Sequence, residues 1–106
     1  MGLDIEIVKD LKSKLRNEFG DIIQEVILFG SRLTGKVGEF SDYDVLIILK
    51  QKPDWTQKRK ISEICYDIEL KNDILIDLHI LSESELQTLR GKQPIFQRAI
   101  NKGIYV

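Results

Sequence analysis

The sequence has few of the residues that define several structural classes. Among its 106 residues there is one cysteine, Cys65, and there are two prolines, Pro53 and Pro94. A single cysteine excludes a disulfide within the chain and any cluster of thiolate metal ligands. Because no repeat, low-complexity stretch or linker interrupts the sequence, we expect one domain that spans residues 1–106.

The chain also lacks an excess of charge of either sign. Its 16 basic and 17 acidic residues give a formal net charge of -1. Domains that bind a nucleic-acid backbone usually carry a basic excess, so the composition does not favour a nucleic-acid partner. The longest apolar run, Val45–Leu49, is far too short to span a membrane, and no signal-peptide pattern opens the chain. We therefore expect a cytoplasmic protein without a membrane partner.

The hydrophobic pattern predicts helices that alternate with strands. Apolar residues at intervals of four predict an amphipathic helix over Leu3–Phe19, ended by Gly20. Short runs rich in strand-forming residues predict strands over Glu25–Phe29, Tyr43–Leu49 and Asp73–Leu81.

Capping-box patterns and a proline mark further helix starts. The pattern at Asp54–Gln57 precedes apolar residues at helical spacing, which we expect in the core: Ile61, Ile64, Cys65 and Ile68. The same pattern at Ser82–Glu85 predicts another helix, ending near Gly91. A last helix is predicted over Pro94–Lys102, stopped by Gly103.

The connection between the first two strands determines the predicted topology. It is a glycine-rich loop of about a dozen residues, whereas a parallel crossover needs a dozen or more residues that are usually helical. We therefore predict an α/β (α+β) fold with a small mixed β-sheet flanked by helices, and not a doubly wound parallel sheet.

The start of this loop is close to a phosphate-binding P-loop but departs from it. Gly30–Lys36 (GSRLTGK) fits the pattern G-x-x-x-x-G-K. The next residue is Val37, where a P-loop needs a Ser or Thr hydroxyl for magnesium. Gly38 and Ser41 also leave no room for the helix that must follow a P-loop. We therefore set this interpretation aside.

Three aspartates are the candidate metal ligands. Asp42 and Asp44 are two residues apart at the start of a predicted strand, so both side chains leave the same face. Carboxylates this close repel each other unless a divalent cation lies between them. Asp77 interrupts an apolar run, and we expect it in a buried central strand, where a carboxylate is costly unless paired or metal-bound. If that strand lies beside Tyr43–Leu49, the three carboxylates can hold two magnesium ions that bridge a triphosphate.

These motifs resemble the DNA polymerase β-type nucleotidyltransferases. The resemblance is carried by Gly30-Ser31, ten intervening residues, Asp42-x-Asp44 and the later Asp77. The G-S-x-x-x-G start and the chain length are similar to the minimal nucleotidyltransferases of bacteria and archaea. The resemblance extends to the final I-F-x-x-A-I-x-x-G-I-Y, while many relatives have a small residue in place of Leu33.

The resemblance implies a magnesium-dependent nucleotidyltransferase that uses ATP as the donor. It implies that Gly30 and Ser31 hold the β- and γ-phosphates of the nucleoside triphosphate. It implies that Asp42 and Asp44 bridge two Mg²⁺ ions, and that Asp77 holds the ion that activates the acceptor hydroxyl and accepts its proton. Attack on the α-phosphate would leave AMP on the acceptor and release pyrophosphate.

The resemblance also suggests a partner. Because one small domain leaves no room for an acceptor-binding domain, we expect the acceptor to be a macromolecule. Minimal nucleotidyltransferases are often paired with small helical HEPN-family proteins as toxin–antitoxin systems, and some adenylylate that partner. The alternative is a non-catalytic antitoxin that neutralises its partner by contact, although the three intact aspartates argue against it. The balanced charge and the absence of a further domain argue against nucleic-acid tailing and aminoglycoside modification.

A few other side chains have two interpretations. His79 shares a strand face with Asp77 and could orient a metal ligand from behind it or touch the nucleotide, although a strand histidine is more often satisfied within the fold. Arg32 and Lys36 could neutralise phosphate charge or lie solvated on the loop. Trp55, at a helix start, fits an anchor or a partner contact better than a base-stacking platform.

Overall fold

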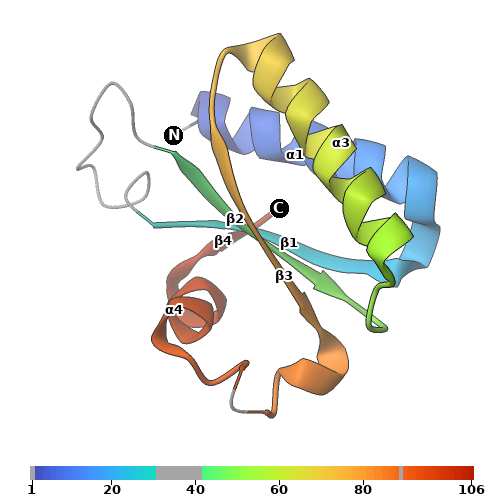
Figure 1. Cartoon of the computed structure of the whole chain (residues 1–106). Helices are drawn as coiled ribbons and strands as arrows, with labels where there is room; N and C mark the ends of the chain where they lie inside the picture. The colour runs from blue at the N-terminus through green and yellow to red at the C-terminus, as the bar shows by residue number, and fades with distance from the viewer. Residues whose placement is uncertain (1, 31–41, 89) are drawn as a thin grey trace.

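The computed structural model describes residues 2–30, 42–88 and 90–106 of the chain. Helices and strands alternate along it (Figure 1). In chain order the elements are α1 (Gly2–Phe19), the 3₁₀ turn η1 (Gly20–Ile22), β1 (Ile23–Phe29), β2 (Tyr43–Leu49), α3 (Trp55–Asn72), β3 (Ile76–Ser82), the 3₁₀ turn η2 (Glu83–Glu85), α4 (Pro94–Lys102) and β4 (Ile104–Tyr105).

The strands form one mixed sheet, as predicted. The strand order is β3-β2-β1-β4. β1 pairs antiparallel with β2 and with β4, whereas β2 and β3 run parallel. Helices α1 and α3 lie on one face of the sheet and α4 lies on the other (Figure 1). The fold class expected from the sequence is therefore confirmed.

Strand alternation divides the apolar residues between the two faces. In β2, Val45 and Ile47 belong to the core cluster formed with α1 and α3, whereas Leu46 and Ile48 belong to the cluster formed with α4. Because side chains alternate along a strand, Asp44 lies on the α4 face with Leu46. By the same alternation, Asp77 and His79 in β3 share that face with Leu81, a buried member of the α4 cluster.

The predicted capping box at the start of α3 is present. The Asp54 carboxylate accepts a hydrogen bond of 2.8 Å from the Gln57 backbone N–H, and the Gln57 side chain accepts one of 3.0 Å from the Asp54 N–H. The four apolar residues expected in the core from this helix are all buried: Ile61, Ile64, Cys65 and Ile68. The helices over Leu3–Phe19 and Pro94–Lys102 are also confirmed.

The helix predicted from Ser82 is wrong. Glu85 does accept hydrogen bonds from the Ser82 N–H at 3.1 Å and from the Ser82 hydroxyl at 2.9 Å, but this contact opens only the short turn η2. The chain then folds back, and the Gly91 N–H donates to the Glu85 carbonyl at 3.1 Å. A Cβ at Gly91 would lie 2.4 Å from that carbonyl oxygen, so the return of the chain requires glycine.

The third strand differs from its prediction in extent and in environment. It begins at Ile76 and not at Asp73, because α3 continues to Asn72 and ends at Asp73, whose φ is 54°. β3 is an edge strand, and the Asp77 side chain is 52% exposed. The expectation of a buried central strand around Asp77 was therefore wrong. The prediction also missed β4, a two-residue strand that pairs with β1 and makes β1 central.

Within the described residues, none of the helices has both the length and the apolar character that crossing a membrane requires.

Candidate functional site

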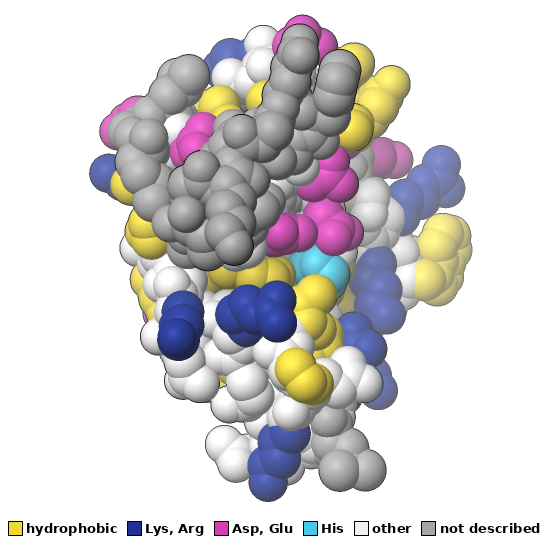
Figure 2. Space-filling view, turned by 90° about the vertical axis from the view of Figure 1, so that its left-hand side faces the viewer, with side chains coloured by type: hydrophobic (Ala, Val, Ile, Leu, Met, Phe, Trp, Pro, Cys, Tyr) yellow, Lys and Arg dark blue, Asp and Glu magenta, His cyan; other side chains and the backbone are white. Residues whose placement is uncertain are grey.

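Two aspartates meet where β2 and β3 begin. Asp44 is the register partner of Asp77 across this parallel strand pair. Neighbouring strands are about 4.8 Å apart, so two side chains that leave the same face at paired positions are in contact range. A carboxylate oxygen from each aspartate and a ring nitrogen of His79 all lie within 4.8 Å of one another. Figure 2 shows acidic side chains gathered beside the histidine on this face.

The pair concentrates negative charge that is only partly relieved within the protein. The pKa of Asp44 is raised above its ordinary value, first by burial and then by the charge of Asp77 and a side-chain hydrogen bond with it. The charge of Asp42 also raises the pKa of Asp44, whereas the charge of His79 lowers it. Such a site favours a proton shared between the carboxylates or a cation between them.

The residue between the first two aspartates fixes the start of β2. Tyr43 is buried on the opposite sheet face, and its hydroxyl donates a 2.5 Å hydrogen bond to the Asp4 carboxylate of α1. Its backbone N–H donates to the Leu75 carbonyl at 2.8 Å, just before β3 begins. The hydroxyl bond ties the start of β2 to α1, and the backbone bond holds the beginnings of β2 and β3 together, where Asp44 lies beside Asp77.

Gly30 lies directly against Asp44. It follows Phe29, the register partner of Asp44 in β1, and its φ is +87°. A Cβ at this position would lie 2.0 Å from the Asp44 Oδ2 atom. Both the backbone conformation and the space therefore require glycine here.

His79 forms the wall of the site next to Asp77. Its Nε2 atom lies 3.4 Å from the Asp77 Oδ2 atom. The imidazole ring packs between two phenylalanines, with centroid distances of 5.6 Å to Phe29 and 6.3 Å to Phe96. Among the described residues, Nε2 is buried and accepts or donates no hydrogen bond.

The predicted site residues fall into three groups. Asp44, Asp77 and Gly30 lie together. Asp42 is exposed immediately before β2, and its charge reaches Asp44. Ser31 lies outside the described residues, as do Arg32 and Lys36.

A basic pocket at the edge of β3 was missed by the sequence analysis. It has a volume of about 200 Å³ and is lined by Lys52, Lys58 and Arg90 together with Pro53, Ile80 and Glu85. The Arg90 guanidinium donates to the Ile80 carbonyl at 3.2 Å and pairs with Glu85 at 3.2 Å. The sequence did carry a local signal for this pocket. Five of the eleven residues in Lys50–Lys60 are basic, although basic and acidic residues are nearly equal in number over the whole chain.

The donors at the aspartate pair fit a divalent metal ion. Two carboxylates supply the oxygen ligands that Mg²⁺ and Mn²⁺ prefer, and the buried imidazole nitrogen without a hydrogen bond supplies a third donor.

Paired aspartates on neighbouring strands of a small mixed sheet, with a glycine packed against them, are the arrangement expected of a nucleotidyltransferase. The chain belongs to the nucleotidyltransferase domain family, whose model matches residues 6–103, and it is therefore a nucleotidyltransferase.

Similar proteins come from an archaeon and from a toxin–antitoxin complex. The chain is 44% identical over 72 residues to the Methanocaldococcus jannaschii protein named "Putative protein adenylyltransferase MJ0141", a match that covers 68% of this chain and 73% of that protein. It is 37% identical over 67 residues to "Putative protein adenylyltransferase MJ1305" of the same organism, covering 61% of this chain and 43% of that protein. A solved structure described as a "toxin-antitoxin with AMP-PNP" shares the fold, with a TM-score of 0.57 and 20% identity over 91% of this chain and 69% of that one.

Proposed function

We propose that this chain transfers AMP from ATP to a hydroxyl group on a partner protein, with Mg²⁺ as the cofactor. The observation that carries the proposal is the contact between the Asp44 and Asp77 side chains at the start of a parallel strand pair, with Gly30 packed against Asp44. The relatives named as protein adenylyltransferases support a protein acceptor. The similarity to a toxin–antitoxin structure supports a toxin as that acceptor, and we propose a HEPN-type protein.

The reaction is a substitution at the α-phosphorus of ATP. The acceptor oxygen forms a bond to this phosphorus, the bond to the oxygen that bridges to the β-phosphate breaks, and pyrophosphate leaves. Asp77 is half exposed, so its carboxylate is accessible to accept the proton of the acceptor hydroxyl. Gly30 and Ser31 would begin the loop that holds the β- and γ-phosphates.

Asp42, Asp44 and Asp77 would hold the metal ions. When bound, these ions neutralise phosphate charge and lower the pKa of the acceptor hydroxyl. The aspartates therefore contribute their negative charge and their fixed positions, which β2 and β3 supply through the strand register.

Radiolabelled ATP tests this proposal. The chain would be incubated with magnesium, the product of the neighbouring gene and ATP labelled with ³²P at either the α- or the γ-phosphate. We expect label on the partner from α-labelled ATP only. Label from γ-labelled ATP would mean phosphoryl transfer and would contradict the proposal.

The variants Asp44→Asn and Asp77→Asn should each abolish the labelling. Asp21→Asn is the matched control, because Asp21 is exposed in η1, at the opposite end of β1 from Gly30 and away from the exposed apolar side chains of α3. It should label the partner like the parent. Undiminished labelling by both site variants would show that the reaction does not require the aspartate pair.

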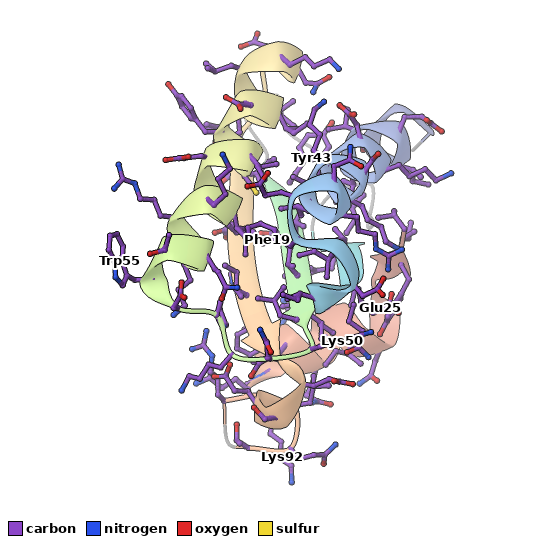
Figure 3. The ribbon with its side chains drawn as sticks, turned by 90° about the vertical axis from the view of Figure 1, so that its right-hand side faces the viewer. Phe19, Glu25, Tyr43, Lys50, Trp55 and Lys92 are labelled. Atoms are coloured by element: carbon purple, nitrogen blue, oxygen red, sulfur yellow. The ribbon has the colours of Figure 1, made fainter. Side chains whose placement is uncertain are left out.

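Neutralisation of a partner by contact alone is the second candidate function. It is favoured by large apolar side chains exposed on α3, since Trp55 is 71%, Tyr66 58% and Leu70 65% exposed. Trp55 projects outward from the start of the helix (Figure 3). If the Asp42→Asn/Asp44→Asn double variant still neutralised the partner in cells, contact would suffice. If neutralisation were lost while the complex still formed, nucleotide transfer would be the function, and this is the result we expect.

A further inference from the structure

His79 is the one histidine in the chain, and its position in β3 places it next to the aspartate pair. Its Nε2 atom is buried, yet it makes no hydrogen bond with any described residue. A buried polar atom without a hydrogen bond costs free energy, so its position calls for a function or a ligand.

The surroundings of the ring fix where this nitrogen lies. Phe29 comes from β1 and Phe96 from α4, and the imidazole is packed between their rings. The His79 side chain is only 19% exposed. The two phenylalanine rings offer Nε2 no hydrogen bond, and this nitrogen lies 3.4 Å from the Asp77 Oδ2 atom.

The distances suit two ligands of one cation. Ligand atoms that each lie about 2.1 Å from an ion are about 3.0 Å apart at the right angle of an octahedral site, the geometry of Mg²⁺ and Mn²⁺, and wider angles between the ligands lengthen this distance. The His79 Nε2 and Asp77 Oδ2 atoms are 3.4 Å apart. One Asp44 oxygen also lies within 4.8 Å of both atoms, so all three donors are gathered at one point of the site.

We propose that His79 Nε2 is a direct ligand of the metal ion that Asp44 and Asp77 hold, so that this site combines two carboxylates with one imidazole. The inference rests on the proposed function, because it places a new ligand in that site. Its consequence is metal preference. A nitrogen ligand favours first-row transition metals over Mg²⁺, and Mn²⁺ shares with Mg²⁺ the preference for carboxylates. The site should therefore select Mn²⁺ over Mg²⁺.

Electron spin-echo envelope modulation of bound Mn²⁺ tests the ligand directly. The experiment uses the full chain without added histidines, alone and with α,β-methylene ATP, which introduces no nitrogen into the phosphate chain. We expect ¹⁴N coupling typical of a coordinated imidazole. Because His79 is the only histidine, labelling histidine with ¹⁵N should replace that ¹⁴N pattern with the ¹⁵N one. This measurement requires no variant and therefore no assumption about folding.

The variant His79→Phe provides the second measurement, because it keeps an aromatic ring between Phe29 and Phe96 and removes the nitrogen. By calorimetry, its affinity for Mn²⁺ should fall tenfold or more, with a smaller loss for Mg²⁺. Loss of a residue that only orients a ligand also weakens metal binding by about 10–100-fold, so affinity alone does not identify a ligand. The ¹⁴N coupling does identify a ligand, and it should vanish in this variant. Asp21→Asn is the control and should bind Mn²⁺ like the parent.

The outcomes separate this inference from the proposed function. If Asp44→Asn and Asp77→Asn lose Mn²⁺ while the parent shows no histidine coupling, His79 is not a ligand and the aspartate site stands. If Mn²⁺ binding is unchanged in both aspartate variants, the metal site itself is wrong and both proposals fall.

Discussion

At the scale of single residues, the site depends on how closely backbone and side chains approach one another. Gly30 has no side chain, and Asp44 occupies the space that one would need. The positive φ of Gly30 alone would disfavour another residue, but Gly20 has a positive φ as well and has nothing within 4 Å of its missing Cβ. Both glycines therefore have a positive φ, but only Gly30 is packed against another side chain, that of Asp44.

The variant Gly30→Ala should lose metal and nucleotide binding while remaining folded. Its methyl group must displace the Asp44 carboxylate from the position beside Asp77. A non-glycine residue at positive φ also costs about 1–3 kcal/mol, and Gly20→Ala shares that cost without the contact. Calorimetry with Mn²⁺ and ATP, together with thermal unfolding, would compare the two variants. Equal binding by both would show that Gly30 does not position Asp44.

Cys65 illustrates a residue that the fold makes chemically inert. It is 4% exposed, and burial, assisted by the charge of Glu69, raises the pKa of its thiol to about 12. The thiol therefore stays protonated in the folded protein well above neutral pH.

We expect Cys65 to react slowly with a disulfide reagent in the native state at both pH 7 and pH 9. In denaturant the same thiol should react fast, and faster at pH 9, where the unfolded thiol ionises. With one thiol in the chain, the absorbance change reports this site alone. Rapid reaction of the native protein at pH 9 would contradict the burial seen in α3.

At the scale of elements, the helices on the two faces of the sheet contribute to the site in different ways. α3 and α1 cover the face opposite the aspartates and form the larger core with β1 and β2. α4 covers the face of the site, and its Phe96 supports His79. Changes in the outer part of α3 should therefore alter stability without altering the site.

The variant Asp54→Ala tests this separation. It removes the N-cap of α3, where the Asp54 carboxylate accepts the Gln57 N–H. Losing such a cap costs about 1 kcal/mol, and each kcal/mol lowers the Tm of a domain of this size by about 4–8 °C. Thermal unfolding should show this drop, while Asp67→Ala, which removes an acid from the same helix without removing the cap, should change Tm much less. A loss of Mn²⁺ affinity in Asp54→Ala would show that α3 and the site are coupled.

At the scale of the whole molecule, the site lowers the stability of the protein when no metal is bound. The folded-state pKa of Asp44 is raised above its ordinary value of 3.8, first by burial and then by Asp77. The folded protein therefore holds this proton more tightly than the unfolded chain does. The free energy of unfolding should fall as the pH rises from about 3.8 through the raised pKa, and the full penalty is present above that raised pKa.

The double variant Asp42→Asn/Asp44→Asn should remove that penalty. In EDTA at neutral pH its Tm should be at least that of the parent, and the difference should shrink as the pH is lowered toward 3.8. Magnesium with a non-hydrolysable ATP analogue should raise the Tm of the parent and leave the variant unchanged. A lower Tm of the variant at neutral pH in EDTA would show that the carboxylates stabilise the fold, and Asp67→Asn controls for the loss of surface charge.

Elements with local signals could be predicted from the amino-acid sequence. The spacing of apolar residues predicted α1, and together with the Asp54–Gln57 capping box it predicted α3. Pro94 and Gly103 marked the two ends of α4, and the runs of strand-forming residues predicted β1, β2 and most of β3. A short glycine-rich connection was enough to predict a mixed sheet, because it constrains how two neighbouring strands can pair.

Features that depend on contacts between distant segments could be seen only in the folded chain. The Ser82–Glu85 contact has the same sequence signature as the box of α3 but opens a single turn, because Gly91 folds back onto Glu85. Asp77 lies exposed on an edge strand, since no strand follows β3 in the sheet of the described residues. The position of His79 between two phenylalanines from β1 and α4 is likewise set by packing, and packing across a sheet is not encoded in any local spacing.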